Sequence, residues 1–154
     1  MGLVKSRLVA GLVIILLTAV AATQPAYAAY NYTTTINVFN CTPYKFRLAD
    51  TMYSGAMVKE PPDQIWWPGD CTDGRYVGTW TTATSGLITS SDVYYNMVDN
   101  SGTSRGRIGF AATTGWGLPN YVHGNCMEVS APFRCRWDTY LSGGAGVVNF
   151  YVSY

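Results

Sequence analysis

The chain has 154 residues, of which 48% are hydrophobic, 14% aromatic and 12% charged, with 10 basic and 9 acidic side chains. This length corresponds to one domain, and so apolar a composition excludes a disordered chain. Without the N-terminal segment that contains Lys5 and Arg7, acidic residues outnumber basic ones by one, so we expect no basic surface for nucleic acid.

The first 28 residues are typical of a secretory signal peptide. Lys5 and Arg7 precede an apolar stretch at residues 8–22, and an Ala-Tyr-Ala sequence ends at Ala28, where we expect cleavage. The apolar stretch of about 15 residues is shorter than the roughly 20 that cross a bilayer as a helix, which disfavours a membrane anchor. We therefore expect residues 29–154 to be secreted as one domain.

Four cysteines in an exported chain predict two disulfides, for which three connectivities exist. We favour pairing between neighbours along the chain, Cys41 with Cys71 and Cys126 with Cys135. A metal site is disfavoured, because no two cysteines have the C-x₂-C spacing and the chain has only one histidine.

The pairing of Cys126 with Cys135 raises a question of register. A two-residue hairpin turn at residues 130–131 would place the two cysteines opposite each other, but it would also place Glu128 opposite Phe133 on the same face. Either a nearby bulge changes the register or the segment is a loop.

Alternation of apolar and polar residues recurs along the mature chain, whereas no stretch of twelve or more residues has helical periodicity. The clearest alternation places Tyr44, Phe46 and Leu48 on one face and Lys45 and Arg47 on the other. About eight or nine strands separated by turn residues predict an all-β, single-domain antiparallel β-sandwich. In chain order, we expect strands at 36–38, 44–48, 75–82, 86–90, 92–99, 105–110, 121–129, 133–138 and 147–153.

Two of these strands form a predicted hairpin around Asn100-Ser101-Gly102, a tripeptide that is typical of a turn. The first of the two has apolar residues on both faces, with Val93 and Tyr95 on one face and Tyr94 and Val98 on the other. We therefore expect this strand to be covered on both sides.

Residue patterns that carry catalysis or bind cofactors are weak in this chain. His123 is the only histidine, and neither a G-x-S-x-G nor an H-E-x-x-H motif occurs. The nine acidic residues are scattered mainly over turns, and the segment 70–74 lacks the third acid and the distal Glu of a calcium loop. We therefore expect a protein that is not an enzyme and that binds neither a metal nor a cofactor.

Two Gly- and Pro-rich segments carry large aromatic residues. Trp66 and Trp67 precede Pro68-Gly69, and Trp116 and Tyr121 lie in a second Gly-rich segment. Trp and Tyr combine an apolar body with a polar tip, which suits a membrane interface or a sugar ring. The alternative is that these rings cap the core, with one of the two adjacent tryptophans pointing inward. We predict that Trp66, Trp67, Trp116 and Tyr121 contact the ligand.

The layout of short motifs between residues 33 and 122 resembles that of the aegerolysin family of small β-sandwich proteins, including their bacterial haemolysin-like and crystal-protein relatives. The residues that carry the resemblance are Ile36-Asn37-Val38, Asn40-Cys41-Thr42, Leu48, Ser54-Gly55, Pro61-Pro62, Ile65, Pro68-Gly69, Gly78, Val93-Tyr94-Tyr95 and Pro119-Asn120-Tyr121.

This resemblance implies a non-enzymatic, toxin- or haemolysin-like protein that recognises membrane lipids, often sphingolipid headgroups, and in some cases works with a larger pore-forming partner. We therefore expect a secreted lipid-binding β-sandwich. The alternatives are a secreted protein-binding module such as an inhibitor or adhesin, a carbohydrate-binding module, and lastly a hydrolase that uses His123.

Overall fold

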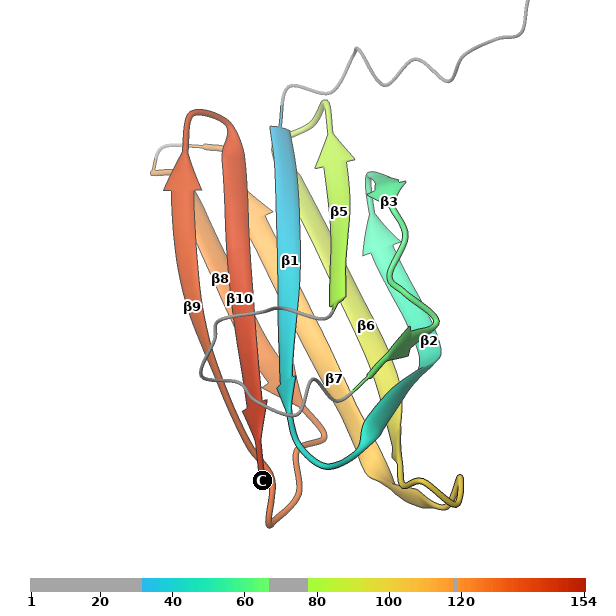
Figure 1. Cartoon of the computed structure of the whole chain (residues 1–154). Helices are drawn as coiled ribbons and strands as arrows, with labels where there is room; N and C mark the ends of the chain where they lie inside the picture. The colour runs from blue at the N-terminus through green and yellow to red at the C-terminus, as the bar shows by residue number, and fades with distance from the viewer. Residues whose placement is uncertain (1–31, 67–77, 118) are drawn as a thin grey trace, which may run out of the picture.

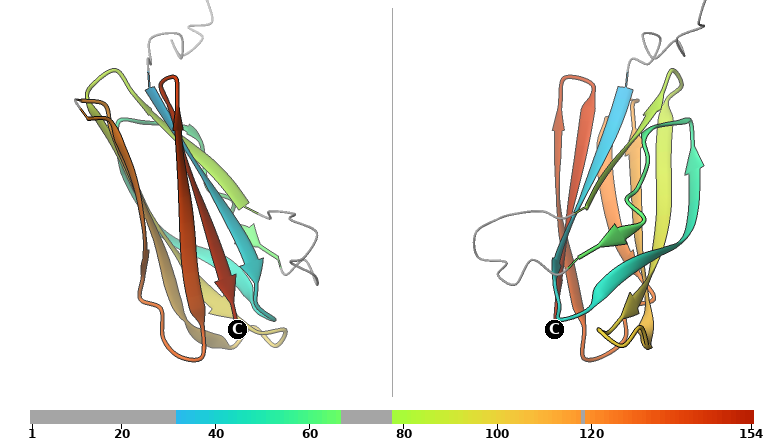
Figure 2. Two further views of the ribbon diagram at one scale, coloured as in Figure 1. Left: turned by 90° about the vertical axis from the view of Figure 1, so that its left-hand side faces the viewer. Right: turned by 45° about the vertical axis from the view of Figure 1, so that its right-hand side comes forward.

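The computed structural model describes residues 32–66, 78–117 and 119–154, and these residues form ten strands and no helix. The strands are β1 (Tyr32–Cys41), β2 (Lys45–Ser54), β3 (Ala56–Lys59), β4 (Gln64–Ile65), β5 (Gly78–Thr84), β6 (Ile88–Val98), β7 (Ser104–Gly115), β8 (Tyr121–Met127), β9 (Arg134–Ser142) and β10 (Ala145–Ser153). They make two five-stranded sheets that face each other, which confirms the predicted all-β sandwich (Figures 1 and 2).

Each sheet combines strands from distant parts of the chain. Sheet A has the order β3-β5-β1-β10-β9, and sheet B has the order β4-β2-β6-β7-β8. In sheet A the first and last strands lie side by side and pair in parallel, with Ile36 of β1 opposite Val148 of β10 (Figure 1). Every other strand pair in the described residues is antiparallel.

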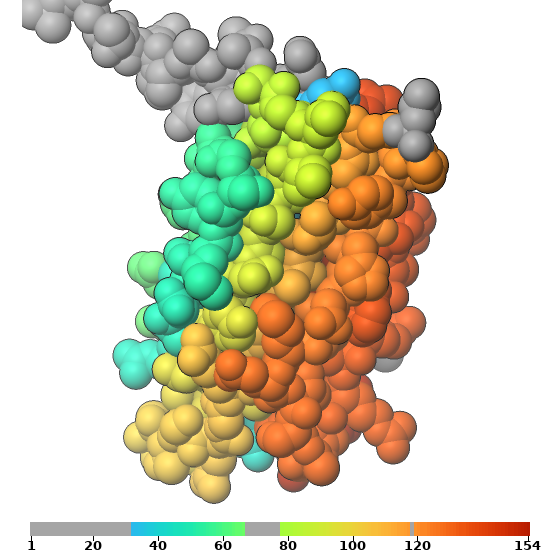
Figure 3. Space-filling model, turned by 180° about the vertical axis from the view of Figure 1, so that it is seen from behind, coloured from blue at the N-terminus to red at the C-terminus, as the bar shows by residue number. Residues whose placement is uncertain are grey.

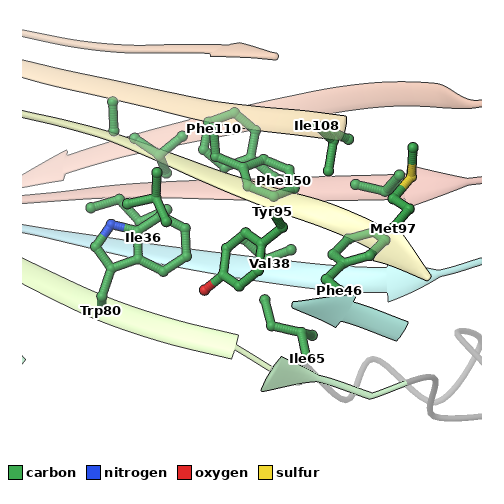
Figure 4. Packing of buried hydrophobic residues seen from close by; sticks show 14 of the residues in the cluster. Ile36, Val38, Phe46, Ile65, Trp80, Tyr95, Met97, Ile108, Phe110 and Phe150 are labelled. Atoms are coloured by element: carbon green, nitrogen blue, oxygen red, sulfur yellow. The ribbon is translucent and has the colours of Figure 1, made fainter. Parts of the chain in front are cut away.

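The core lies between the two sheets, where alternate residues of each strand point inward. Five fully buried aromatic residues lie at its centre, and the ring centroids of the contacting pairs are 5.1 to 6.5 Å apart (Figure 4). These spacings are within the range in which aromatic pairs attract each other beyond their burial. The five residues are Phe46, Trp80, Tyr95, Phe110 and Phe150.

Buried threonines connect the two sheets at the end of the sandwich where β1 begins. Thr34 of β1 donates a hydrogen bond to Thr114 of β7 at 2.7 Å, and Thr89 of β6 donates one to Thr82 of β5 at 2.8 Å. All four side chains are almost fully buried. Because each hydroxyl has a partner across the core, these polar residues are buried without leaving a hydrogen bond unmade.

The predicted hairpin around residues 100–102 is confirmed, because β6 and β7 pair antiparallel and Gly102 has a φ of +83°. The expectation that the first strand is covered on both sides is wrong. Val93 and Tyr95 are fully buried, but on the other face Tyr94 is only half-buried and Asn96 is exposed. The outer face of sheet B has no second layer over it in the described part of the chain (Figure 3).

Several strand boundaries also differ from the prediction. β2 continues beyond Leu48 to Ser54. The alternation in the sequence ends at Leu48 because the register shifts between Leu48 and Asp50. The short strands β3 and β4 are absent from the prediction, and the two strands expected at 86–90 and 92–99 form a single strand, β6. The first residues of the strand expected at 75–82 lie outside the described residues, and β5 begins at Gly78.

The predicted disulfide between Cys126 and Cys135 is confirmed, with the two Cα atoms 6.2 Å apart. It does not lie within a hairpin, because β8 belongs to sheet B and β9 to sheet A. The residues between the strands form a loop that crosses from one sheet to the other, with Glu128 at a φ of +57°. The bond therefore joins the two sheets. The predicted Cys41–Cys71 bond and the predicted signal peptide involve residues outside the described part of the chain.

Candidate functional site

The aromatic residues predicted as one binding site lie at opposite ends of the sandwich. Trp66 follows β4 and lies beside the turn between β6 and β7. Trp116 follows the far end of β7, and Tyr121 begins β8 opposite that same end. Twelve residues of β7 separate the two regions, so one small ligand could not contact all of these rings. Trp67 lies outside the described residues.

Trp66 is the most exposed tryptophan among the described residues, with 63% of its surface accessible. The ammonium of Lys45, at the start of β2, lies 4.2 Å from the centroid of its indole ring. The two side chains line a pocket of about 300 Å³ together with Pro43, Asp99 and Asn100. An apolar ring, a cation and an amide therefore meet at one concave place on the surface.

The buried Asn40 side chain forms hydrogen bonds to the backbone segments that precede Lys45 and Trp66. Its amide nitrogen donates a hydrogen bond to the carbonyl of Tyr44 at 2.7 Å and approaches the carbonyl of Ile65 at 3.5 Å. Its oxygen accepts hydrogen bonds from the backbone N–H and the hydroxyl of Thr42, at 3.1 and 2.8 Å. Asn40 thus connects the residues just before Lys45 and just before Trp66.

Asp99 structures the opposite wall of the pocket. One carboxyl oxygen accepts hydrogen bonds from the Ser101 hydroxyl at 2.6 Å and from the backbone N–H groups of Ser101 and Thr103. The other oxygen forms an ion pair with Arg105 at 2.7 Å. Asp99 thus shapes the turn, and because Arg105 balances its charge, Lys45 is the charged residue of the pocket lining that has no ion pair among the described residues.

We expect Asp99 to stay ionised at unusually low pH. The hydrogen bond from Ser101, together with those from Arg105 and Thr103, lowers the pKa of Asp99 to about 2. A carboxyl whose pKa is lower in the folded than in the unfolded chain stabilises the fold fully above about pH 4, and this contribution is lost as the pH falls towards 2. A carbon-detected NMR titration of Asp99 measures this directly. An Asp99→Asn variant should lose the corresponding part of the pH dependence, and titration of Asp99 at pH 4 or above would contradict the expectation.

Trp116 is part of the packed interior and does not present its ring to a ligand. It is only 4% exposed, and its ring stacks on Tyr32 with centroids 4.7 Å apart. Its backbone N–H donates to the carbonyl of Leu87 at 2.7 Å. The alternative that these rings cap the core therefore describes Trp116.

Tyr121 is 47% exposed on the outer face of sheet B, the face that Figure 3 shows. Its ring lies directly over Gly115, where the Cβ of any other residue would overlap the ring. Close to half of the Tyr121 side chain nevertheless stays accessible to solvent. Ile88, opposite Gly115 on β6, is also exposed, so a small apolar surface forms at this end.

His123 is exposed on β8 and contacts Trp137 edge to face, with the ring centroids 6.3 Å apart. No hydrogen bond or ion pair joins it to an acidic residue among the described side chains. Within residues 32–66, 78–117 and 119–154, no three His, Cys, Asp or Glu side chains gather as metal ligands. The same residues contain no helix that could cross a membrane.

Comparison with known proteins leaves the function to be inferred from this geometry. No protein-family model matches the chain, and no curated protein matches it. The aegerolysin-like resemblance therefore stays a prediction.

Sequence reasoning missed most of the pocket around Trp66. The sequence indicates Lys45 only as a residue on the polar side of an alternating strand and Asn100 only as a turn residue, and it gives no signal for Pro43. The pocket residues come from three segments of the chain, at 43–45, 66 and 99–100, which the pairing of β2 with β4 and β6 brings together. A Lys one residue before a buried Phe in the same strand carries no local signal of this long-range contact.

Proposed function

We propose that this protein is a secreted, non-enzymatic membrane-lipid-binding protein whose headgroup site is centred on Trp66 and Lys45. The observation that carries the proposal is the exposed indole of Trp66 with the Lys45 ammonium 4.2 Å from its centroid, at the mouth of a pocket. Tryptophan prefers the interfacial region of a bilayer, and lysine near it attracts anionic headgroups.

The chemistry of the pocket fits a phosphate-bearing headgroup. Lys45 supplies the cation for a phosphate oxygen, and the Asn100 side chain supplies amide donors beside it. The Trp66 ring lies next to that position and contributes apolar contact with the glycerol or acyl region. A volume of about 300 Å³ suits a headgroup and is at the small end of known ligand pockets.

Vesicle binding tests this function. The probes are vesicles of phosphatidylcholine alone, with phosphatidylserine, and with sphingomyelin. Burial of an indole is worth roughly 1.5–3 kcal/mol, so Trp66→Ala should weaken binding about tenfold to a hundredfold. Lys45→Ala removes about 1 kcal/mol of attraction to an anionic surface and should reduce binding to phosphatidylserine vesicles about fivefold.

Two control variants separate this site from the rest of the surface. Arg47→Ala removes an exposed cation two residues along the same strand, and Leu87→Ala removes an exposed apolar side chain at the opposite end. Both should bind as the wild type does. A wild-type protein that binds none of the three vesicles would refute the lipid proposal, and equal losses in all four variants would refute the site.

Secretion and a pore-forming partner are further parts of the proposal. The Cys126–Cys135 disulfide supports export, because disulfides persist mainly in oxidising compartments. The aegerolysin-like resemblance supports a toxin-like role and a larger pore-forming partner. Addition of the protein alone to dye-loaded vesicles should then cause binding without leakage.

A carbohydrate-binding function is the second candidate, and the exposed Tyr121 ring favours it. The ring packs against Gly115 and is 47% exposed, and an exposed aromatic ring supported from beneath can stack on a sugar ring. A glycan panel separates the two functions, because Tyr121→Ala should abolish glycan binding and leave vesicle binding unchanged. Trp66→Ala should do the reverse.

A further inference from the structure

The edges of the two sheets differ in length on the two sides of the sandwich. On one side the edge strands are β3, with four residues and an irregular register, and β4, with two residues. On the other side they are β8, with seven residues, and β9, with nine. Figure 2 faces this second side in its left view. Short or irregular edge strands discourage pairing with another chain, whereas long regular ones permit it.

β9 is the longer of these two edge strands. It pairs with β10 without interruption from Arg134 to Ser142. It has no proline and no bulge, two features that block an edge, and its charged residues are of both signs. It also exposes apolar surface, because Trp137 is 41%, Tyr140 59% and Leu141 38% accessible.

The order of side chains along β9 is complementary to itself. Residues 134, 136, 138 and 140 point to the outer face of sheet A. If two copies of β9 pair antiparallel with Trp137 opposite Trp137, Arg136 of each copy lies opposite Asp138 of the other. In the same register Arg134 lies opposite Tyr140. The pairing thus makes two opposite-charge pairs and two cation–aromatic pairs, all of which stabilise a sheet.

The charges that would meet across this edge are already held in place. Asp138 accepts a hydrogen bond from Asn149 at 2.7 Å and another from the Tyr151 hydroxyl at 3.1 Å. The Arg136 guanidinium lies over the Tyr151 ring, 4.4 Å from its centroid. A carboxylate has about four acceptor positions, so Asp138 can still accept bonds from an arginine. Side chains that are ordered before association lose less entropy on binding.

We propose that two copies of this chain associate through their β9 strands, about a twofold axis at Trp137, to form one continuous ten-stranded sheet from the two copies of sheet A. The charge complementarity of Arg136 and Asp138 selects a second copy of the chain as the occupant of this edge. A twofold axis is the commonest symmetry of protein oligomers, and it requires just such a self-complementary surface.

The test measures the mass of the purified protein by sedimentation equilibrium over a range of concentrations. The wild type should be a dimer. Arg136→Asp places two aspartates opposite each other in the dimer, and Asp138→Arg places two arginines opposite each other. Each variant alone should dimerise about tenfold more weakly or worse. An equimolar mixture should recover dimer, because the new aspartate of one variant faces the new arginine of the other.

Further variants keep the outcome interpretable. Arg47→Asp makes the same charge change as Arg136→Asp, but on β2 of sheet B, and should stay dimeric. Asp138→Arg also removes the bonds to Asn149 and Tyr151, so Tyr140→Lys, which places a lysine opposite Arg134, tests the edge if that variant does not fold. A wild type that is monomeric at all concentrations, or folded variants that dimerise as the wild type does, would overturn the proposal. Failure of the folded mixture to recover dimer would overturn the register.

Discussion

Trp80→Ala is expected to lower the free energy of unfolding by about 3–5 kcal/mol, the range for removal of a buried tryptophan. Trp80 is fully buried in β5 and contacts Tyr95 and Phe110 from sheet B, with ring centroids 6.5 and 6.4 Å away. Its indole N–H donates to the Ser91 hydroxyl at 3.2 Å. The alanine variant therefore leaves a large cavity between the sheets and a buried hydroxyl without its partner.

Trp80→Phe is the matched control, because it keeps an aromatic ring in the core and loses the hydrogen bond to Ser91. We expect it to cost roughly half as much as the alanine change, since a buried hydrogen bond and part of the ring volume are lost. Urea unfolding followed by circular dichroism measures both variants. If Trp80→Ala were as stable as the wild type, β5 would not be packed against sheet B in the way described.

The strands that could be predicted are those in which one face is buried and the other is not. In β1 and β10 the alternation of the sequence becomes an alternation of burial, because every second side chain enters the core. The tripeptide at residues 100–102 also determines its hairpin locally, since Asp99 and Gly102 close the turn without help from the rest of the chain.

The pairing of strands could not be read in the same way. The parallel neighbours β1 and β10 are more than a hundred residues apart in the chain, and neither sequence indicates which strand is its partner. The disulfide shows the same difficulty. Cys126 and Cys135 are close enough in sequence for a hairpin, but the loop between them crosses from one sheet to the other. The local pattern predicted the pair of cysteines and not the strands that they join.

The candidate site was only partly predictable for a related reason. An exposed ring and a buried ring look alike in a Gly-rich segment, so Trp66 and Trp116 had the same signal in the sequence. The structure separates them, because Tyr32 from the start of β1 stacks on Trp116, whereas Lys45 approaches Trp66 and leaves it 63% exposed. Burial at both positions depends on strands that are distant in sequence.

Asn40→Ala is expected to damage both the fold and the proposed lipid site. Asn40 is fully buried, and its side chain bonds the Tyr44 carbonyl and the backbone N–H of Thr42. Each buried backbone group that loses its partner costs about 1–3 kcal/mol, so we expect a total loss of about 2–4 kcal/mol. The Thr42 hydroxyl, 3.3 Å from the Tyr44 carbonyl, compensates for part of the loss.

The effect on binding follows from what Asn40 connects. Its amide reaches towards Ile65 and Tyr44, the residues that immediately precede Trp66 and Lys45, so its removal frees both side chains to move relative to each other. Vesicle binding by the folded fraction of Asn40→Ala should therefore fall, although Asn40 itself is inaccessible to lipid.

Asn37→Ala is the control, because Asn37 lies on the same strand and bonds Asn149 and Thr79 on the half-buried outer face of sheet A. It should cost about 1 kcal/mol and leave vesicle binding unchanged. If the folded Asn40→Ala and Asn37→Ala variants bound vesicles equally well, the positions of Lys45 and Trp66 would not depend on Asn40.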